Sequence, residues 1–147
     1  MEIRFAQKKD LESIVSLCKA HAEYEKADFV EANKVGLLSK YLFGNSNELK
    51  CLVVDKESKL VGYATYFKQF STWDACYYVY LDCLFLKEEV RGQGIGKRIM
   101  QHIKEFAKLE ACSIIQWQTP TFNTKAINFY QKIGAESKSK ERFIWEV

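Results

Sequence analysis

The chain has 147 residues, 48% hydrophobic and 28% charged, which fits one globular domain, 1–147, with a sizeable core. No segment approaches the roughly 18 consecutive apolar residues of a membrane span, and the N-terminus lacks a signal-peptide pattern, so we expect a cytoplasmic protein without membrane contact. Residues 1–90 carry 12 Lys/Arg against 14 Asp/Glu, and residues 91–147 carry 10 against 5. Charge splits of this size also occur by chance. The excess of positive charge in residues 91–147 nevertheless suits an anionic ligand there.

Two classes of ligand are disfavoured by the residue pattern. No basic run is interleaved with aromatic residues, which argues against nucleic-acid binding. The five cysteines are odd in number and far apart, so we expect neither a metal site nor a disulfide framework. They are Cys18, Cys51, Cys76, Cys83 and Cys112.

The first half of the chain predicts one strand, two helices and the start of a meander. Residues 2–5 alternate polar and apolar side chains, as a strand does. Asp10 is a candidate N-cap for a helix whose apolar residues recur from Leu11 to Ala22, and a second helix is expected over 34–42, ended by a polar turn at 44–47. Strands over 49–54 and 60–70 flank a polar connection at 55–59.

The second half predicts alternating strands and helices. A strand over 75–86 follows the turn 71–74, and an amphipathic helix runs from Ile95 to about Leu109. A strand over 113–118 precedes a helix over 124–133 with Asn123 as N-cap and Gly134 at its end. Residues 142–147 are expected to form a last strand. The order β-α-α-β-β-β-α-β-α-β predicts a mixed α+β domain with a mostly antiparallel sheet flanked by helices.

A glycine-rich loop at 91–96 lies between a strand and a helix. The backbone amides of the loop would point outward at the N-terminus of the helix, which is its positive end and binds a phosphate well. The simpler alternative is a tight turn that binds no ligand. The loop is not a P-loop, because Gly96 and Lys97 are followed by Arg98 in place of the hydroxyl residue. Nor is it a dinucleotide fingerprint, since the spacing is Gly-x-Gly-x-Gly late in an antiparallel meander.

The loop matches the signature Arg/Gln-x-x-Gly-x-Gly/Ala of GNAT acetyltransferases as Arg91-x-x-Gly94-x-Gly96. The family's Asn, Ala and Phe-Tyr pattern in the next helix appears as Asn123-x-x-Ala126-x-x-Phe129-Tyr130. The chain therefore resembles the GNAT superfamily, and this resemblance implies a GNAT-like fold and acetyl-CoA as cosubstrate.

Within that superfamily the sequence resembles the spermidine/spermine (diamine) acetyltransferase branch. The similarity is carried by the segments 22–25, 62–67 with Trp73, 80–86 and 91–96. The branch has a Glu where this chain has Asp82, nine positions before the loop arginine. The side chain of Asp82 is one methylene shorter than that of Glu, so its carboxylate lies closer to the backbone. This favours proton transfer through a water.

The resemblance implies a set of ligand contacts. Backbone groups at Leu84, Phe85 and Leu86 would pair with pantetheine, and Asn123 and Ala126 would contact CoA. The pyrophosphate would be taken by amides of the loop and held near Arg91. The loop residues concerned are Gly92, Gln93, Gly94, Ile95, Gly96 and Lys97. Residues expected to border the amine are Tyr24, Glu25, Asp82, Gln116, Trp117 and Gln118.

Two residues are candidates for the chemistry. A primary amine with a pKa near ~10.4 is protonated at neutral pH and must lose a proton before it attacks a thioester. Asp82 could accept this proton directly or through water, unless it is a structural carboxylate. The Tyr130 hydroxyl could protonate the leaving thiolate, unless its ring only packs in the core. A cysteine acyl-enzyme at Cys83 is disfavoured, because His21 and His102 are expected on helices elsewhere.

The acceptor is expected to be a small cationic amine such as a diamine, polyamine or lysine analogue. An acidic stretch from Glu23 to Glu31 suits such a molecule, although a solvated helix end explains it equally well. The alternatives are acetylation of a protein N-terminus or lysine, or a non-catalytic acyl-CoA-binding module. The resemblance also implies a homodimer formed through the strands after the second motif, with no metal.

Overall fold

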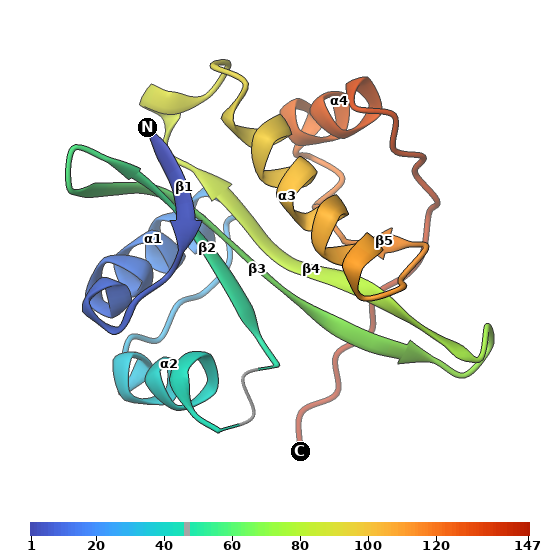
Figure 1. The fold of residues 1–147 in the computed structure, drawn as a ribbon, viewed down its shortest axis with the longest axis horizontal. Helices are drawn as coiled ribbons and strands as arrows, with labels where there is room; N and C mark the ends of the chain where they lie inside the picture. The colour runs from blue at the N-terminus through green and yellow to red at the C-terminus, as the bar shows by residue number, and fades with distance from the viewer. Residues whose placement is uncertain (46–47) are drawn as a thin grey trace.

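The computed structural model describes residues 1–45 and 48–147, which form a mixed sheet with helices on both faces (Figure 1). The sheet order is β1-β2-β3-β4-β5, and every neighbouring pair is antiparallel except β4 and β5, which are parallel. Two short 3₁₀ turns, Lys8–Asp10 and Glu88–Val90, precede α1 and the loop before α3. The elements are β1 Glu2–Phe5, α1 Leu11–Tyr24, α2 Lys34–Phe43, β2 Lys50–Lys56, β3 Lys59–Ser71, β4 Cys76–Leu86, α3 Ile95–Leu109, β5 Ile115–Gln116 and α4 Thr124–Lys132.

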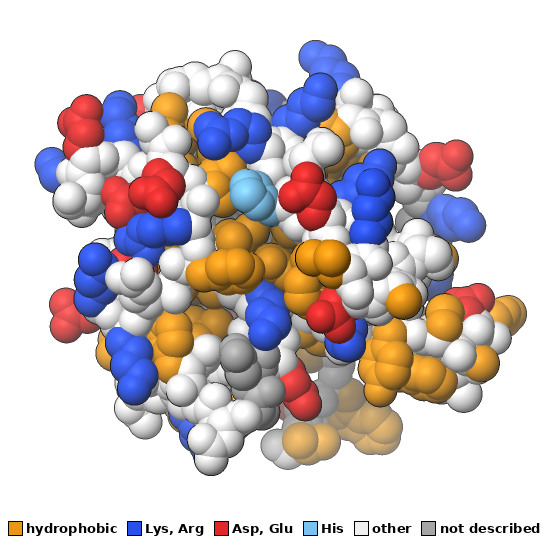
Figure 2. Space-filling view, in the orientation of Figure 1, with side chains coloured by type: hydrophobic (Ala, Val, Ile, Leu, Met, Phe, Trp, Pro, Cys, Tyr) orange, Lys and Arg blue, Asp and Glu red, His pale blue; other side chains and the backbone are white. Residues whose placement is uncertain are grey.

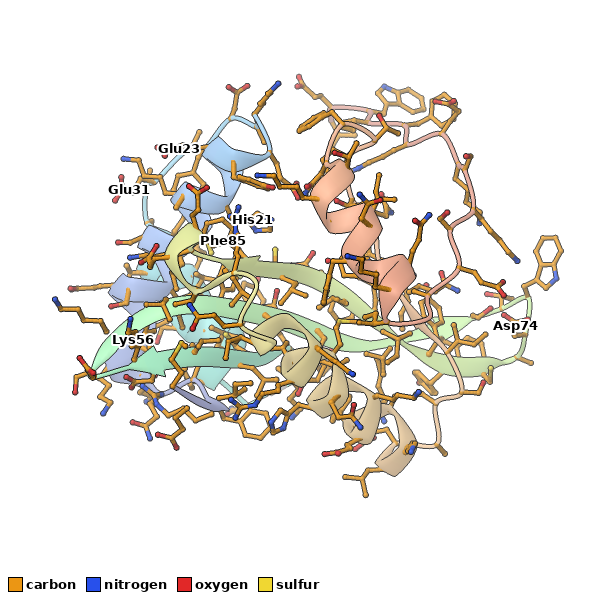
Figure 3. The ribbon with its side chains drawn as sticks, turned by 90° about the horizontal axis from the view of Figure 1, so that it is seen from above. His21, Glu23, Glu31, Lys56, Asp74 and Phe85 are labelled. Carbon is orange, nitrogen blue, oxygen red and sulfur yellow. The ribbon has the colours of Figure 1, made fainter. Side chains whose placement is uncertain are left out.

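The central part of the sheet is buried on both faces. Figure 3 shows α1 and α3 on opposite sides of it. Ile95, Ile99 and Ile103 of α3 are each at most 4% exposed and belong to one core cluster with Leu52 and Val54 of β2. On the other face, the apolar side of α1 covers alternate residues of the same strands. Because burying one isoleucine contributes about 1.5–3 kcal/mol, α3 is held firmly against the sheet, and its N-terminus with it.

A β-bulge interrupts β4 beside β3. Thr65 pairs with Cys83 and Tyr66 with Leu81, so Asp82 is an extra residue without a partner in β3. The bulge changes which residues face which core: Leu81 packs on the α3 side, whereas Cys83 packs on the α1 side. A bulge bends a strand and re-aims side chains, and here the residue it frees is an acid.

The predicted fold class is confirmed, but several local predictions were wrong. Residues 142–147 form no strand, since no neighbouring strand in the described chain pairs with them. The strand expected over 113–118 spans only Ile115–Gln116. The hairpin connection expected over 55–59 consists of the two turn residues 57 and 58. The predicted turn at 44–47 extends into residues 46 and 47, which lie outside the described part.

Asp10 was expected to cap α1, but its side chain makes other bonds. It accepts a hydrogen bond from the Gln7 amide at 2.7 Å and forms an ion pair with Arg4 at 2.7 Å. Arg4 also contacts Asp55 at 2.9 Å, so the cluster ties β1 to β2 and to the start of α1. None of the helices in the described part of the chain has the length and hydrophobicity that crossing a membrane requires.

Candidate active site

The loop before α3 presents the N-terminus of a 15-residue helix to solvent. The Arg98 amide donates to the Gly94 carbonyl at 3.1 Å, so the amides before it have no helical acceptor. Gly92 and Gly94 have φ values of 74° and 77°, and a Cβ at either would meet no atom within 4 Å. The first turn of α3 contains no acidic residue. These features fit an anionic group such as a pyrophosphate.

Other predicted loop residues shape the turn. Arg91 Nε donates to the Leu86 carbonyl at 2.8 Å, and Gln93 Nε2 donates to the Glu89 carbonyl at 2.9 Å. Ile95 is 4% exposed and belongs to the core, so only its amide faces the loop. Lys97 is exposed, and its side chain adds positive charge at the helix N-terminus.

One edge of β4 is open beyond Tyr80. Pairing with β5 is confined to Val79 and Tyr80 in the described chain. The Lys87 amide donates to Val61 of β3, and polar groups of successive residues point to opposite sides of a strand. The main-chain groups of Leu84 and Leu86 therefore point to the open edge. Those of Phe85 point to β3, which corrects the prediction that all three could pair with a ligand.

Asp82 lies at the bulge with an exposed side chain. Its Oδ2 accepts hydrogen bonds from Thr65 Oγ1 at 3.2 Å and from Cys83 Sγ at 3.6 Å. These two donors orient the carboxylate without enclosing it. The side chain therefore remains available to a cationic ligand on the α1 face of the sheet.

The start of α4 is built as predicted. Asn123 caps the helix, because its Oδ1 accepts a hydrogen bond from the Ala126 amide at 3.3 Å. Gly134 has a φ of 92° just after the helix, and the Ala135 amide closes back onto the Tyr130 carbonyl. With both ends fixed, α4 holds its side chains at a defined place beside β4.

Tyr130 packs its ring against Trp117 and Phe129, with centroid distances of 5.0 and 5.1 Å. Burial, with a smaller effect of Glu25, raises the pKa of the Tyr130 hydroxyl to about 12. The hydroxyl is thus protonated at neutral pH, as a proton donor must be.

Tyr24 joins the two predicted cofactor motifs. Its ring lies 4.4 Å from the Arg91 guanidinium carbon, and its hydroxyl donates to Asn123 Oδ1 at 3.2 Å. Arg91 also lies 5.6 Å from the Phe85 ring. Beside this bridge lies a cleft of about 240 Å³, lined by Tyr24, Lys26, Phe122, Asn123, Thr124 and Lys125.

His21 lies in the last turn of α1, on a helix as expected, and its side chain reaches this region. Its ring stacks on that of Phe85, with ring centroids 5.2 Å apart. Figure 3 labels the two residues close to each other. Nδ1 lies 3.0 Å from the Tyr63 hydroxyl, and Nε2 lies 3.2 Å from Glu25 Oε1. The helical spacing could have revealed it: His21 comes four residues after the buried Leu17, on the face of α1 that packs on the sheet.

The remaining predicted residues are placed less centrally. Gln116 and Gln118 are exposed around β5, and Trp117 between them packs against Tyr130. Burial raises the pKa of the Cys83 thiol to about 12, which disfavours a thiolate nucleophile. Within residues 1–45 and 48–147, no group of three or more His, Cys, Asp or Glu residues could hold a metal ion.

The region as a whole offers three chemical features in sequence along β4. They are an exposed carboxylate at the bulge, an open strand edge, and a helix N-terminus with cationic side chains around it. An elongated ligand with an amide-bearing arm and a phosphate end fits the last two. A cationic group fits the first.

Comparison with known proteins gives matches over most of the chain. The model of the acetyltransferase (GNAT) family matches residues 9–135. Thialysine N-epsilon-acetyltransferase of Sus scrofa is 33% identical over 142 residues, covering 90% of this chain and 82% of that protein. Spermine/spermidine N(1)-acetyltransferase of Bacillus subtilis is 28% identical over 117 residues, covering 78% and 75%. The structure of an integron cassette protein from the V. cholerae mobile metagenome has a TM-score of 0.80 at 27% identity, covering 99% and 92%.

Proposed function

The chain belongs to the acetyltransferase (GNAT) family and is an acetyl-CoA-dependent N-acetyltransferase, and from this premise we propose that its acceptor is the primary amine of a small cationic molecule. The observation that carries the proposal is the exposed carboxylate of Asp82, freed by the bulge on the face that α1 covers. A carboxylate there attracts an ammonium group and can take its proton. The relatives named for thialysine and for spermine/spermidine act on amines of this kind.

The cosubstrate would lie along β4. The N-terminal amides of α3, with Arg91 and Lys97 nearby, would hold its pyrophosphate. Leu84 and Leu86 would pair through their outward main-chain groups with its pantetheine arm, and the same amides would stabilise the oxyanion formed at the thioester carbonyl. Asn123 and Ala126 would border the arm from the start of α4.

The chemistry would proceed by direct attack in a ternary complex. Asp82, held by Thr65 and Cys83, would take the ammonium proton directly or through a water. The neutral amine then attacks the thioester carbon. Tyr130, whose hydroxyl has a pKa raised to about 12, would give its proton to the departing thiolate.

A second cleft supports a cationic acceptor. It has a volume of about 260 Å³ and is lined by Tyr41, Glu48, Leu49 and Phe67. Phe67 lies two residues after Thr65 in β3, so both side chains, and with them Asp82, share one face of the sheet. Aromatic faces with a carboxylate suit the carbon chain and far ammonium group of a diamine. Tyr24, Glu25 and Trp117 would border the reacting end.

We extend the proposal to the state of the protein in the cell. Residues 1–147 would act as one catalytic domain, and the free cysteines suit a reducing compartment such as the cytoplasm. A homodimer would cover Phe143, Ile144 and Trp145, which are at least 80% exposed. Figure 2 shows a further hydrophobic gathering over the β3–β4 hairpin, where Phe70 and Tyr77 are half exposed.

An acceptor panel tests the proposal. The protein is given acetyl-CoA with diamines, polyamines, lysine analogues or lysine-containing peptides, and thiol release is followed. We expect turnover with the small cationic amines, and a loss of about 10²-fold or more for Asp82→Ala. The matched control, Asp74→Ala in the β3–β4 turn, should behave like the wild type.

Two outcomes would overturn the acceptor assignment. One is turnover on peptides alone, which would favour a protein acetyltransferase. The other is tight acetyl-CoA binding without turnover on any amine, which would favour a non-catalytic binding module.

A further inference from the structure

The imidazole of His21 connects a buried tyrosine to an acidic side chain at the end of α1. Its Nδ1 lies 3.0 Å from the Tyr63 hydroxyl, and its Nε2 lies 3.2 Å from Glu25 Oε1. The ring also stacks on that of Phe85, with centroids 5.2 Å apart, and both residues are labelled in Figure 3. His21 therefore has a partner at each ring nitrogen and a defined ring plane.

The two partners determine which ring nitrogen carries the proton. A carboxylate can only accept a hydrogen bond, so Nε2 must carry the hydrogen that it donates to Glu25. In the neutral ring, Nδ1 then has a free lone pair and accepts from the Tyr63 hydroxyl. Tyr63 is 2% exposed, so its hydroxyl is shielded from competing water. The buried hydroxyl thus favours the form of the ring that binds Glu25.

The carboxylate of Glu25 is held by this bond but remains open to a ligand. His21 Nε2–H binds one of its two oxygens, and the Glu25 side chain is 31% exposed, against 14% for His21. A long acidic side chain in solvent samples several rotamers. Holding it in one of them beforehand lowers the entropy lost when a ligand binds.

Glu25 and Asp82 are supported from neighbouring positions on one face of the sheet. Tyr63 and Thr65 are two residues apart in β3, so their side chains lie on the same face, about 7 Å apart along the strand. Thr65 Oγ1 donates to Asp82 Oδ2 at 3.2 Å. Tyr63 supports Glu25 in a similar way, with His21 in between. Both carboxylates are therefore anchored on the face that α1 covers.

We propose that His21 and Tyr63 are positioning residues, which hold the Glu25 carboxylate ready for the ammonium group of the acceptor. The inference rests on the proposed function, in which Asp82 takes the proton of that ammonium. Glu25 attracts and orients the same group, so binding and deprotonation depend on different carboxylates. His21 acts only through Glu25, and its effect belongs in the acceptor KM rather than in kcat.

Two substitutions at His21 separate positioning from packing. His21→Gln loses the ring but carries an amide N–H at the same place along the side chain as Nε2, so it can still donate to Glu25. His21→Asn carries its amide at the place of Nδ1, too short to reach Glu25. Both variants lose the stacking on Phe85, so a difference between them reports the hydrogen bond. His102→Asn, on the exposed side of α3, is the matched control.

Steady-state kinetics with a diamine acceptor measure the effect. His21→Asn should raise the acceptor KM about tenfold, because a hydrogen bond to a charged group is lost. Both kcat and the KM for acetyl-CoA should change by less than about twofold. His21→Gln should keep the acceptor KM within about threefold of the wild type. The control His102→Asn should change none of these constants.

A double-mutant cycle tests whether His21 acts through Glu25. Glu25→Gln should itself raise the acceptor KM about tenfold, and adding His21→Asn to it should cause no further rise. Equal losses in the Gln and Asn variants of His21, or a rise of both KM values, would show that His21 only packs on Phe85. An unchanged acceptor KM in His21→Asn, or a full further rise in the Glu25→Gln background, would also overturn the inference.

Tyr63→Phe decides the question if melting curves show that the His21 variants do not fold. It removes the donor to Nδ1 and lets the ring proton move to that nitrogen, which leaves no donor for Glu25. The acceptor KM should then rise about threefold at unchanged kcat, and no rise would overturn the inference. A failure of the proposed function is distinct from all of these results, because the wild type itself would then acetylate no diamine.

Discussion

The hydroxyl of Tyr24 donates a hydrogen bond to Asn123 Oδ1 at 3.2 Å, across 99 residues of sequence. The same oxygen caps α4 by accepting from the Ala126 amide, and the Tyr24 ring packs on the Arg91 guanidinium. One side chain at the end of α1 therefore fixes both the loop before α3 and the start of α4. These are the two segments expected to hold acetyl-CoA.

Substitution of Tyr24 should weaken acetyl-CoA binding more than it slows the chemistry. Tyr24→Phe removes only the hydrogen bond, worth about 0.5–1.5 kcal/mol, and should raise the KM for acetyl-CoA about two- to tenfold. Tyr24→Ala also removes the contact with Arg91 and should raise it further. Steady-state kinetics with varied acetyl-CoA measure both effects. Tyr77→Phe at the exposed hairpin is the control, and an unchanged KM in both Tyr24 variants would contradict the prediction.

Gly94→Ala and Gly96→Ala should impair the loop for different reasons. At Gly94 the φ of 77° places a Cβ in the left-handed region, which costs about 1–2 kcal/mol although the space is open. At Gly96 a Cβ would lie 3.0 Å from the Phe129 ring and push α3 away from α4. We expect both variants to unfold at lower urea and to bind acetyl-CoA less tightly. Calorimetric titration checks the binding, and unaltered affinity in both would count against the loop as its site.

Tyr130→Phe should separate packing from proton donation. The ring contacts with Trp117 and Phe129 survive, so the free energy of unfolding should change by less than about 1 kcal/mol. If the hydroxyl protonates the thiolate, kcat should fall by about 10²-fold or more while the KM values stay similar. Single-turnover measurements with saturating acetyl-CoA test this. A variant with wild-type kcat would show that Tyr130 only packs.

The parts of the site that follow a local pattern could be predicted from the sequence. The spacing of Ile95, Ile99 and Ile103 indicates the buried face of α3, and the glycines before it indicate the loop. The Asn123 cap is local as well, since its acceptor and donor are three residues apart. Each of these depends on residues within two helical turns, where periodicity is informative.

The rest depends on pairings between distant segments. The bulge at Asp82 arises from its register with Thr65, and the open edge of β4 arises because β5 pairs only at Val79 and Tyr80. Residues 142–147 contain the apolar run Phe143, Ile144 and Trp145, but such a run forms a strand only where another strand pairs with it. The contacts of His21 could not be predicted, because its partners, Tyr63 and Phe85, come from two strands that are distant in sequence.

Asp10→Asn should destabilise the protein in a pH-dependent manner. The Arg4 guanidinium and the Gln7 amide hold the pKa of Asp10 below its ordinary value of 3.8, although burial opposes them. A lowered pKa means that the folded state favours the carboxylate. This stabilisation is present above 3.8 and is lost as the pH falls through the lower, folded-state pKa.

Urea unfolding across this pH range measures the effect. Near neutral pH the Asn variant should be less stable by about 2 kcal/mol, because the side chain of Asp10 is only 7% exposed and its ion pair with Arg4 is lost. The difference should shrink as the pH falls below 3.8, since wild-type Asp10 then becomes neutral as well. Asp74→Asn, in an exposed turn, should show little difference at any pH. A gap between wild type and Asp10→Asn that is equally large in acid and at neutral pH would mean that the ionised carboxylate is not what ties β1 to α1.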